Sequence, residues 1–201
     1  MSQTKVAIGM VDATGTPGSG NFLRGDGSWN APSGGGWEFV SESVASSSAT
    51  IAFTGFETGY DYQVVAYNVL PATDNQHCHG ELGVTGPSYR TSNYLGSSTG
   101  VHNGGATTGV ESTSGLPVTW NPQGSQSDEQ LIFNLEIYDP VPAAPTFTHG
   151  TCKMQNSGSE MGGGWVGGWH TASDAIVAIQ FKYASGNIST GTFQLYKRVN
   201  A

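Results

Sequence analysis

Apolar and polar residues alternate along several segments of the chain, most clearly after residue 130. Successive side chains of a β-strand point to opposite faces, so alternation with a period of two predicts strands with one buried face. The residues that share the apolar side in the three clearest segments are Leu131, Phe133, Leu135 and Ile137; Val177, Ile179, Phe181 and Tyr183; and Phe193 and Leu195. These three faces are predicted to form the core.

Nine segments are predicted to be strands, because each is bounded by Gly, Pro, Asn or Asp. They are residues 37–41, 48–53, 61–70, 76–84, 106–112, 130–138, 146–154, 175–183 and 191–199. Segment 61–70 is apolar on both faces and is expected at the centre of a sheet or at a subunit interface. No segment has the apolar period of an amphipathic helix, so an all-β fold of two packed antiparallel sheets is predicted.

The first 36 residues differ from the rest of the chain. Residues 16–32 read TPGSGNFLRGDGSWNAP, and Pro and Gly punctuate this run too densely for a helix or a long strand. Phe22, Leu23 and Trp29 are therefore expected to be anchors that bury themselves against another surface. With the flexible run 33–36 as a joint, residues 1–36 are predicted to be an extended attachment arm and residues 37–201 one domain. In the alternative, the arm folds back onto its own domain.

Composition and charge exclude several classes of partner. The chain has 201 residues, 30 of them Gly, and 11% are charged, which is typical of short strands joined by many turns. A net charge of -8 argues against a nucleic-acid partner. No apolar run is long enough for a signal peptide or a membrane span, so neither export by that route nor a membrane partner is expected. Cys78 and Cys152 are predicted to be free, buried thiols of a protein that folds in a reducing cytoplasm.

Two groups of side chains are candidates for sites of chemistry. His77 and His79 lie two residues apart in a predicted strand and share one face, an arrangement that can offer two metal ligands. Cys78 points the other way, and no third His follows at the usual spacing, although His102, His149 or His170 could complete a site in space. The pattern favours surface or interface histidines, and no cofactor is expected. The carboxylates Asp61, Asp74, Asp128, Glu129 and Glu136 form no recognisable catalytic pair, so the protein is not expected to be an enzyme.

The stretch GGGWVGGWH, residues 162–170, is the best candidate for binding. Trp165 and Trp169, followed by His170, can form an aromatic platform on which a sugar ring stacks. The pattern favours a different interpretation, in which both Trp side chains lie on the same face of a strand and enter the core, and the glycines permit close backbone approach or bulges. Residues 83–130 are expected to form mostly long loops, where binding surfaces usually lie, and Tyr89 and Tyr94 are candidate binding residues there.

The stretch GTPGSGNFLRGDGSW resembles the FLRGDGTW-type motif of bacteriophage tail-fibre and related virion proteins. Later segments resemble a domain that often closes such chains. They are GYDY at 59–62 with the following VVAYNVLPATD, then LIFNLEIYDP, and finally ASDAIVAIQFKYASGNISTGTFQLY.

This resemblance implies a jelly-roll-like β-sandwich on a virion, assembled in the host cytoplasm and trimeric. Residues 1–36 are then expected to join other virion proteins. The domain is expected to act as a tail or head fibre that adheres to host-surface glycan or protein, with avidity from several symmetric copies. The alternative is a capsid decoration or cement protein that staples the shell without a host ligand.

Overall fold

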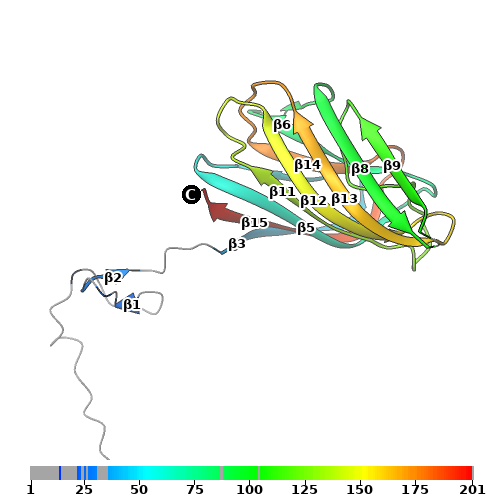
Figure 1. Ribbon diagram of the computed structural model, residues 1–201, viewed down its shortest axis with the longest axis horizontal. Coiled ribbons are helices and arrows are strands. Elements are labelled where there is room, and N and C mark those ends of the chain that lie inside the picture. The colour runs from blue at the N-terminus through cyan, green and yellow to red at the C-terminus, as the bar shows by residue number, and fades with distance from the viewer. Residues whose placement is uncertain are drawn as a thin grey trace, which may run out of the picture. The chain divides into compact units, whose positions relative to one another are not determined.

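The structure is a computed structural model that describes residues 14, 22–23, 25, 27–30, 36–86, 88–103 and 105–200 (Figure 1). The chain divides into two compact units, Met1–Gly36 and Trp37–Ala201, which are described separately. The described residues contain no helix, and therefore none that is long and apolar enough to cross a membrane.

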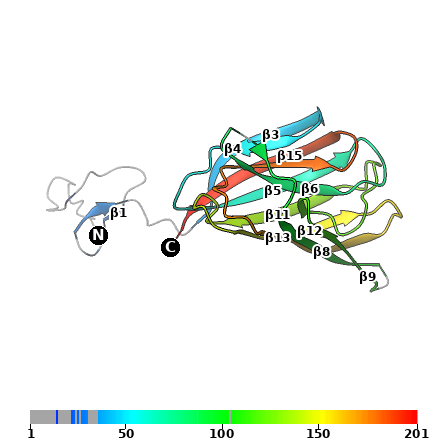
Figure 2. The same cartoon turned by 90° about the horizontal axis from the view of Figure 1, so that it is seen from above.

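The larger unit consists of two antiparallel sheets (Figures 1 and 2). The eight-stranded sheet has the order β3 (Glu38–Ser48), β15 (Ile188–Val199), β5 (Tyr60–Pro71), β11 (Leu131–Tyr138), β12 (Thr146–Gln155), β13 (Met161–His170), β8 (Tyr94–His102) and β9 (Thr107–Ser112). The five-stranded sheet has the order β10 (Leu116–Pro117), β6 (Cys78–Val84), β14 (Ala178–Tyr183) and β4 (Ile51–Thr54), and β7 (Ser88–Tyr89) pairs with β6. The predicted all-β, jelly-roll-like antiparallel β-sandwich is confirmed.

The core lies between the two sheets and is centred on three phenylalanines. Phe133 of β11 contacts Phe181 of β14 with ring centroids 5.2 Å apart, and Phe193 of β15 lies 5.7 Å from Phe181. The predicted core faces are buried with one exception, Val177, which is half-buried. Val177 precedes the first residue of β14, so the alternation of that strand does not extend to it, and Ile176 enters the core instead.

Strand β5 lies between β15 and β11, which confirms that segment 61–70 is central in its sheet. Its alternation is shifted by a bulge, because β5 has one residue more than β11 between Ala66 and Val69, and one more than β15 between Tyr67 and Leu70. Asn68, at the bulge, has a φ of 56°. The extra residue brings Val69 to the same inner face as Val64 and Ala66, and all three are fully buried.

Two strands of the eight-stranded sheet, β8 and β13, were not predicted. The expectation of mostly long loops over residues 83–130 is wrong for residues 94–102, which form β8. The inner faces of both strands carry glycine where an apolar side chain would reveal the pattern. The Trp120 ring fills this space, since a Cβ atom at Gly100 or Gly162 would overlap it.

The described part of the smaller unit is a β-hairpin. Strand β1 (Phe22–Leu23) pairs with β2 (Trp29–Asn30), so Leu23 lies directly opposite Trp29. Thr14 adds to β2, because its carbonyl accepts a hydrogen bond from the Trp29 N–H at 2.7 Å. Leu23 is 45% exposed and Trp29 is half-buried. The side chain of Phe22 and residues 31–35 lie outside the described residues, so the role of the arm stays a prediction.

Both Cys side chains are free and buried, as predicted. Cys78 lies in the core, and burial raises its pKa. Burial likewise raises the pKa of Cys152 to about 12. Neither sulfur is therefore poised to react in the folded protein.

Candidate functional site

An exposed tryptophan stands on the outer face of the eight-stranded sheet. Trp165, in β13, is 65% exposed, whereas the next residue, Val166, is buried in the core. The neighbours of Trp165 along the same face are Gly163 and Gly167, which have no side chain. The ring is therefore uncovered on both sides along the strand. The interpretation that the sequence favoured, in which both Trp side chains enter the core, is wrong.

Shallow hollows flank the Trp165 ring. One, of about 390 Å³, is lined by Thr99, Lys153, Gly163 and the Trp165 ring among others. The other, of about 290 Å³, includes His149 and Gly167 and shares Thr99 and Trp165 with the first. The glycines leave the floor of each hollow at the level of the backbone.

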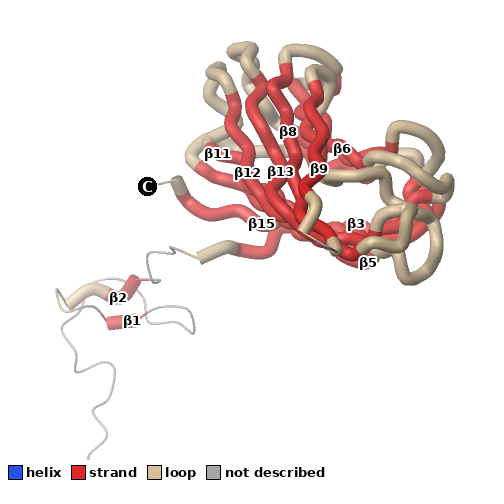
Figure 3. Tube along the Cα trace, turned by 45° about the vertical axis from the view of Figure 1, so that its right-hand side comes forward, coloured by secondary structure: helices blue, strands red, loops and turns tan. Residues whose placement is uncertain are grey.

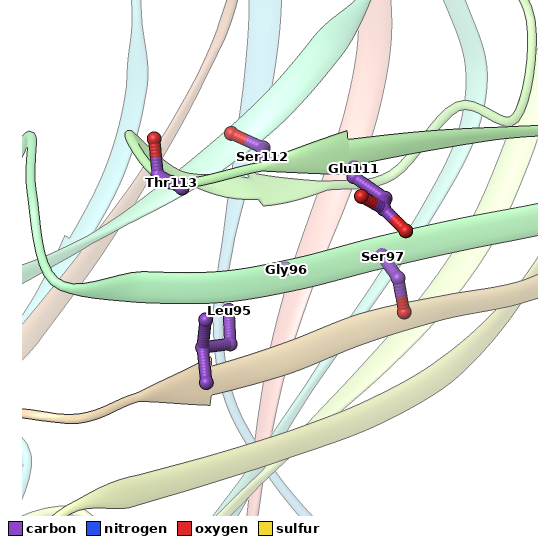
Figure 4. A pocket seen from close by; sticks show the side chains of 6 residues that line it. All are labelled: Leu95, Gly96, Ser97, Glu111, Ser112 and Thr113. Carbon is purple, nitrogen blue, oxygen red and sulfur yellow. The ribbon is translucent and has the colours of Figure 1, made fainter.

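Two further hollows extend this surface across the strands. A hollow of about 200 Å³ shares Thr151 and Lys153 with the first and reaches Val65 of β5. A hollow of about 510 Å³ shares Ser97 with the second and reaches Glu111 of β9 (Figure 4). Figure 4 shows the Glu111 side chain directed toward Ser97 on the neighbouring strand. The four hollows therefore adjoin one another from β9 to β5, over strands that lie side by side in Figure 3.

The register of the strands arranges the outer side chains in three transverse rows. We call them the Trp row, the acid row and the Lys row. The Trp row contains Asn134, Thr151, Trp165 and Thr99; the acid row contains Glu136, His149, Gly167, Ser97 and Glu111; and the Lys row contains Ile132, Lys153, Gly163, Val101 and Thr107.

The Trp row is rich in hydrogen-bonding groups. The Oδ1 atom of Asn134 accepts hydrogen bonds from the Thr151 N–H at 2.8 Å and from the Thr151 hydroxyl at 2.7 Å. The Thr99 side chain lies on the other side of Trp165. An apolar ring flanked by hydroxyl and amide groups matches a ligand with both apolar and hydroxyl-bearing faces.

Trp169 lies on the same face but in a different environment. Its ring stacks on Phe147 with centroids 4.8 Å apart and an interplanar angle of 18°. Leu95 lies opposite Trp169 on the other side, and Phe147 and Leu95 are both more than half exposed. These residues form an apolar end of the outer face.

His170 and Tyr94 do not reach this face. His170 is fully buried and packs against Tyr94, with ring centroids 4.9 Å apart. The Tyr94 hydroxyl accepts a hydrogen bond from the Leu82 N–H and donates one to the Arg90 carbonyl. Burial lowers the pKa of His170 and raises that of Tyr94. Their environment is that of core residues.

Tyr89 lies elsewhere, in β7 of the five-stranded sheet, opposite Gly83. The structure therefore brings together Trp165 and Trp169 of the five sequence-predicted binding residues. It does not place Tyr89, Tyr94 or His170 beside them on the outer face.

His77 and His79 have partners within the five-stranded sheet region. The His77 Nδ1 atom lies 3.1 Å from the Thr119 hydroxyl, and the His79 Nε2 atom lies 3.5 Å from a carboxylate oxygen of Glu81. Glu81 also binds Lys182 at 2.7 Å. Burial is the main cause that lowers the pKa of both histidines. Within the described ranges, no group of three or more His, Cys, Asp or Glu residues is arranged to hold a metal ion.

Two of the carboxylates considered above meet at one guanidinium. Arg198 Nε lies 3.0 Å from Asp61 Oδ2, and Arg198 Nη2 lies 3.7 Å from Glu136 Oε2. Glu136 also accepts a hydrogen bond from the Tyr138 hydroxyl at 2.9 Å. Glu129 is buried. Asp61 and Glu136 are thus engaged in a polar network at the Glu136 end of the acid row.

Sequence reasoning missed Thr99, His149, Thr151 and Lys153 as parts of this site. Three of them lie on the polar side of the predicted strand 146–154, where alternation already indicated outward side chains. Their position beside Trp165 depends on the pairing of β12 with β13, which no local pattern reveals.

No family model matches the chain, and no curated protein matches it. Solved structures with some similarity include a legume lectin-like domain from Entamoeba histolytica, with 8% identity over 74% of this chain and 76% of that chain and a TM-score of 0.28. Another is an alginate lyase from Alteromonas sp. 272, with 8% identity over 79% of this chain and 79% of that chain and a TM-score of 0.28. A third is the baseplate tripod of bacteriophage Tuc2009, with 11% identity over 100% of this chain and 82% of that chain and a TM-score of 0.22. At these scores the similarities carry no functional argument.

Proposed function

We propose that this chain is a bacteriophage virion protein that binds host-surface glycan, without catalysis, through the outer face around Trp165. The observation that carries the binding proposal is the exposure of the Trp165 ring between two glycine-floored hollows. The proposal places binding on a sheet face, whereas the sequence pattern favoured loops.

The Trp165 ring is exposed to water in the folded protein, which is unfavourable for an apolar group. Burying a large apolar side chain contributes about 1.5–3 kcal/mol, and Trp165 retains most of this potential in the folded protein. A sugar ring has an apolar face of C–H groups and an edge of hydroxyls. Stacking that face on Trp165 covers the indole, while the hydroxyls meet Thr99, Thr151 and Asn134 in the Trp row.

The sheet also keeps the entropic cost of binding low. Trp165 belongs to a strand that is paired on both sides, with β12 and β8, so its backbone is already ordered. Ligands that bind preorganised groups lose less of their interaction energy to ordering. The hollows over Gly163 and Gly167 leave room for the substituents of neighbouring sugars.

The virion part of the proposal rests on the N-terminal motif. The stretch that resembles the phage motif contains β1 and Trp29 of β2, which pair and leave Leu23 partly exposed opposite Trp29. Such a hairpin offers an apolar surface to another virion protein. We further propose a trimer at the head or tail surface, in which weak individual sites gain avidity from multiple copies.

The experiment is glycan binding by the purified full chain and two variants. Trp165→Ala is expected to weaken binding to host-surface polysaccharide by about tenfold or more. Phe39→Ala is the matched control, because Phe39 is a comparably exposed aromatic residue on edge strand β3 of the same sheet. Equal effects of the two substitutions would contradict the proposal.

Two further observations separate this function from its alternatives. Imaging of labelled virions distinguishes a projecting domain, expected for adhesion, from one that lies flat against the shell, expected for a cement protein. Shortening of the polysaccharide during incubation with the purified chain would contradict the non-enzymatic part of the proposal.

A further inference from the structure

Lys153 differs from the other described basic residues. Arg90, Lys182, Lys197 and Arg198 each contact a carboxylate. No ion pair in the described part of the chain involves Lys153, although the chain has a net charge of -8. Lys153 therefore has no ion-pair partner among the described residues, in a protein whose acidic residues outnumber its basic residues.

The position of Lys153 connects it to the Trp165 site. Lys153 lines both the hollow of about 390 Å³ beside Trp165 and the adjoining hollow of about 200 Å³. Its partner in the register is Gly163, so no side chain on β13 lies directly opposite it. The backbone of Lys153 is one row away from that of Trp165, about 7 Å along the strand direction.

The charges on the two sides of the Trp row are opposite. The Lys row contains Lys153 and no acidic residue, whereas the acid row on the other side contains Glu111 and also Glu136, which has Arg198 3.7 Å away. A ligand in the Trp row therefore meets positive charge on one edge and negative charge on the other. At physiological salt, electrostatic interactions are screened beyond about 8 Å, so these charges orient the ligand groups that contact the outer face.

The row of hollows is longer than one sugar ring. From β9 to β5 it crosses five inter-strand spacings, roughly 24 Å at about 4.8 Å each. Adjoining hollows on both sides of Trp165 fit a polysaccharide that extends in both directions from the sugar at Trp165. A single terminal sugar would occupy only the part beside Trp165.

We infer that the ligand is an extended acidic glycan that crosses the strands along the Trp row, with one sugar stacked on Trp165 and its anionic group bound by Lys153. Because Lys153 is the single Lys or Arg in the three rows, and Glu111 and Glu136 stand on the other side of the Trp row, the anionic groups of the preferred glycan are widely spaced along its chain. A densely charged polyanion would place further charges against Glu111 and Glu136. This inference rests on the proposed glycan-binding function.

The test uses an array of bacterial capsular and O-antigen polysaccharides, each printed in native form and after chemical reduction of its carboxylates to alcohols. A parallel set is dephosphorylated, which distinguishes carboxylate from phosphate as the anionic group. The full chain is expected to bind native acidic polysaccharides about tenfold more tightly than their neutralised forms. Polygalacturonate, printed as a densely charged probe, is expected to bind more weakly.

Lys153→Gln is expected to abolish this preference and to retain binding to the neutralised forms. Lys197→Gln removes the same charge from the same sheet and is expected to keep the preference, since Lys197 instead pairs with Glu57. Trp165→Ala is expected to weaken binding to both forms.

The outcomes separate the two proposals. If native and neutralised glycans bind equally, or if Lys153→Gln and Lys197→Gln behave alike, the acidic ligand is contradicted while the Trp165 result still supports glycan binding. If no polysaccharide binds, or if Trp165→Ala binds as the native chain does, the glycan-binding function itself fails.

Discussion

Gly100 is a position where one methyl group tests the packing beneath the candidate site. Gly100 lies on the inner face of β8, and a Cβ atom there would overlap the Trp120 ring. Trp120 is 1% exposed and stacks on His102 with ring centroids 5.5 Å apart, so it has little freedom to move away. Gly100→Ala should therefore strain the packing that positions β8 beside β13.

The expected effect is a decrease of about 1–3 kcal/mol in the free energy of unfolding, the usual cost of overpacking a core. In a domain of this size, each kcal/mol lowers the melting temperature by roughly 2–4 °C. Without the overlap, Gly→Ala in an ordinary conformation would stabilise the protein by about 0.4–1 kcal/mol. Overlap with Trp120 thus predicts a lower free energy of unfolding for Gly100→Ala, and the absence of overlap predicts a higher one.

Urea unfolding followed by circular dichroism measures the change. Gly36→Ala is the control, because a Cβ atom at Gly36 would meet nothing within 4 Å. In a double-mutant cycle, Trp120→Ala, which removes the ring atoms that a Cβ at Gly100 would overlap, should be less costly in the Gly100→Ala background, with a coupling of about 0.5–3 kcal/mol. If Gly100→Ala proves as stable as the native chain, or if the two substitutions are additive, Trp120 is not what requires glycine here.

Three further outcomes are expected. Tyr183→Phe removes the hydroxyl that donates to Gln123 Oε1 at 2.6 Å and leaves this buried acceptor unpaired. The free energy of unfolding in urea should fall by about 1–3 kcal/mol, and an unchanged unfolding midpoint would contradict this. Burial holds the pKa of His170 below 6.5, so the stability contributed by the neutral imidazole is present above that pH and is lost on acidification. The native chain should therefore lose more stability than His170→Phe between pH 7.5 and about pH 5.5. Equal losses would contradict this prediction. Cys78 and Cys152 should stay unreactive toward a disulfide reagent until urea unfolds the protein, whereas rapid reaction of the folded chain would show that they are accessible.

The parts of the fold that could be predicted are those in which apolar side chains mark the inner face. LIFNLEIY shows this plainly, since Leu131, Phe133, Leu135 and Ile137 alternate with outward residues and are all buried. In β8 and β13 the inner face is occupied by glycines such as Gly100 and Gly162. The apolar volume there comes from Trp120, which is distant in sequence from both strands, so local alternation could not reveal them.

The candidate site shows the same limit. Trp165 was identified from its Gly-rich context, but the pattern did not decide between a core position and an exposed one. Lys153 lay on the polar side of a predicted strand, with no signal that placed it beside a tryptophan. Only the register of β12 with β13 brings Thr151 opposite Trp165 and Lys153 into the adjoining row. Long-range strand pairing is not encoded in any short window of sequence.

The most direct test of the central claim is chemical-shift mapping on the isotope-labelled full chain, titrated with the polysaccharide that the array identifies. The account predicts that the largest shifts fall on residues 97–101, 149–153 and 163–167, including the Trp165 indole N–H, with little change in β4, β6 and β14. Shifts concentrated in the five-stranded sheet, on edge strand β3, or in the segment around Tyr89 would contradict binding by the face around Trp165.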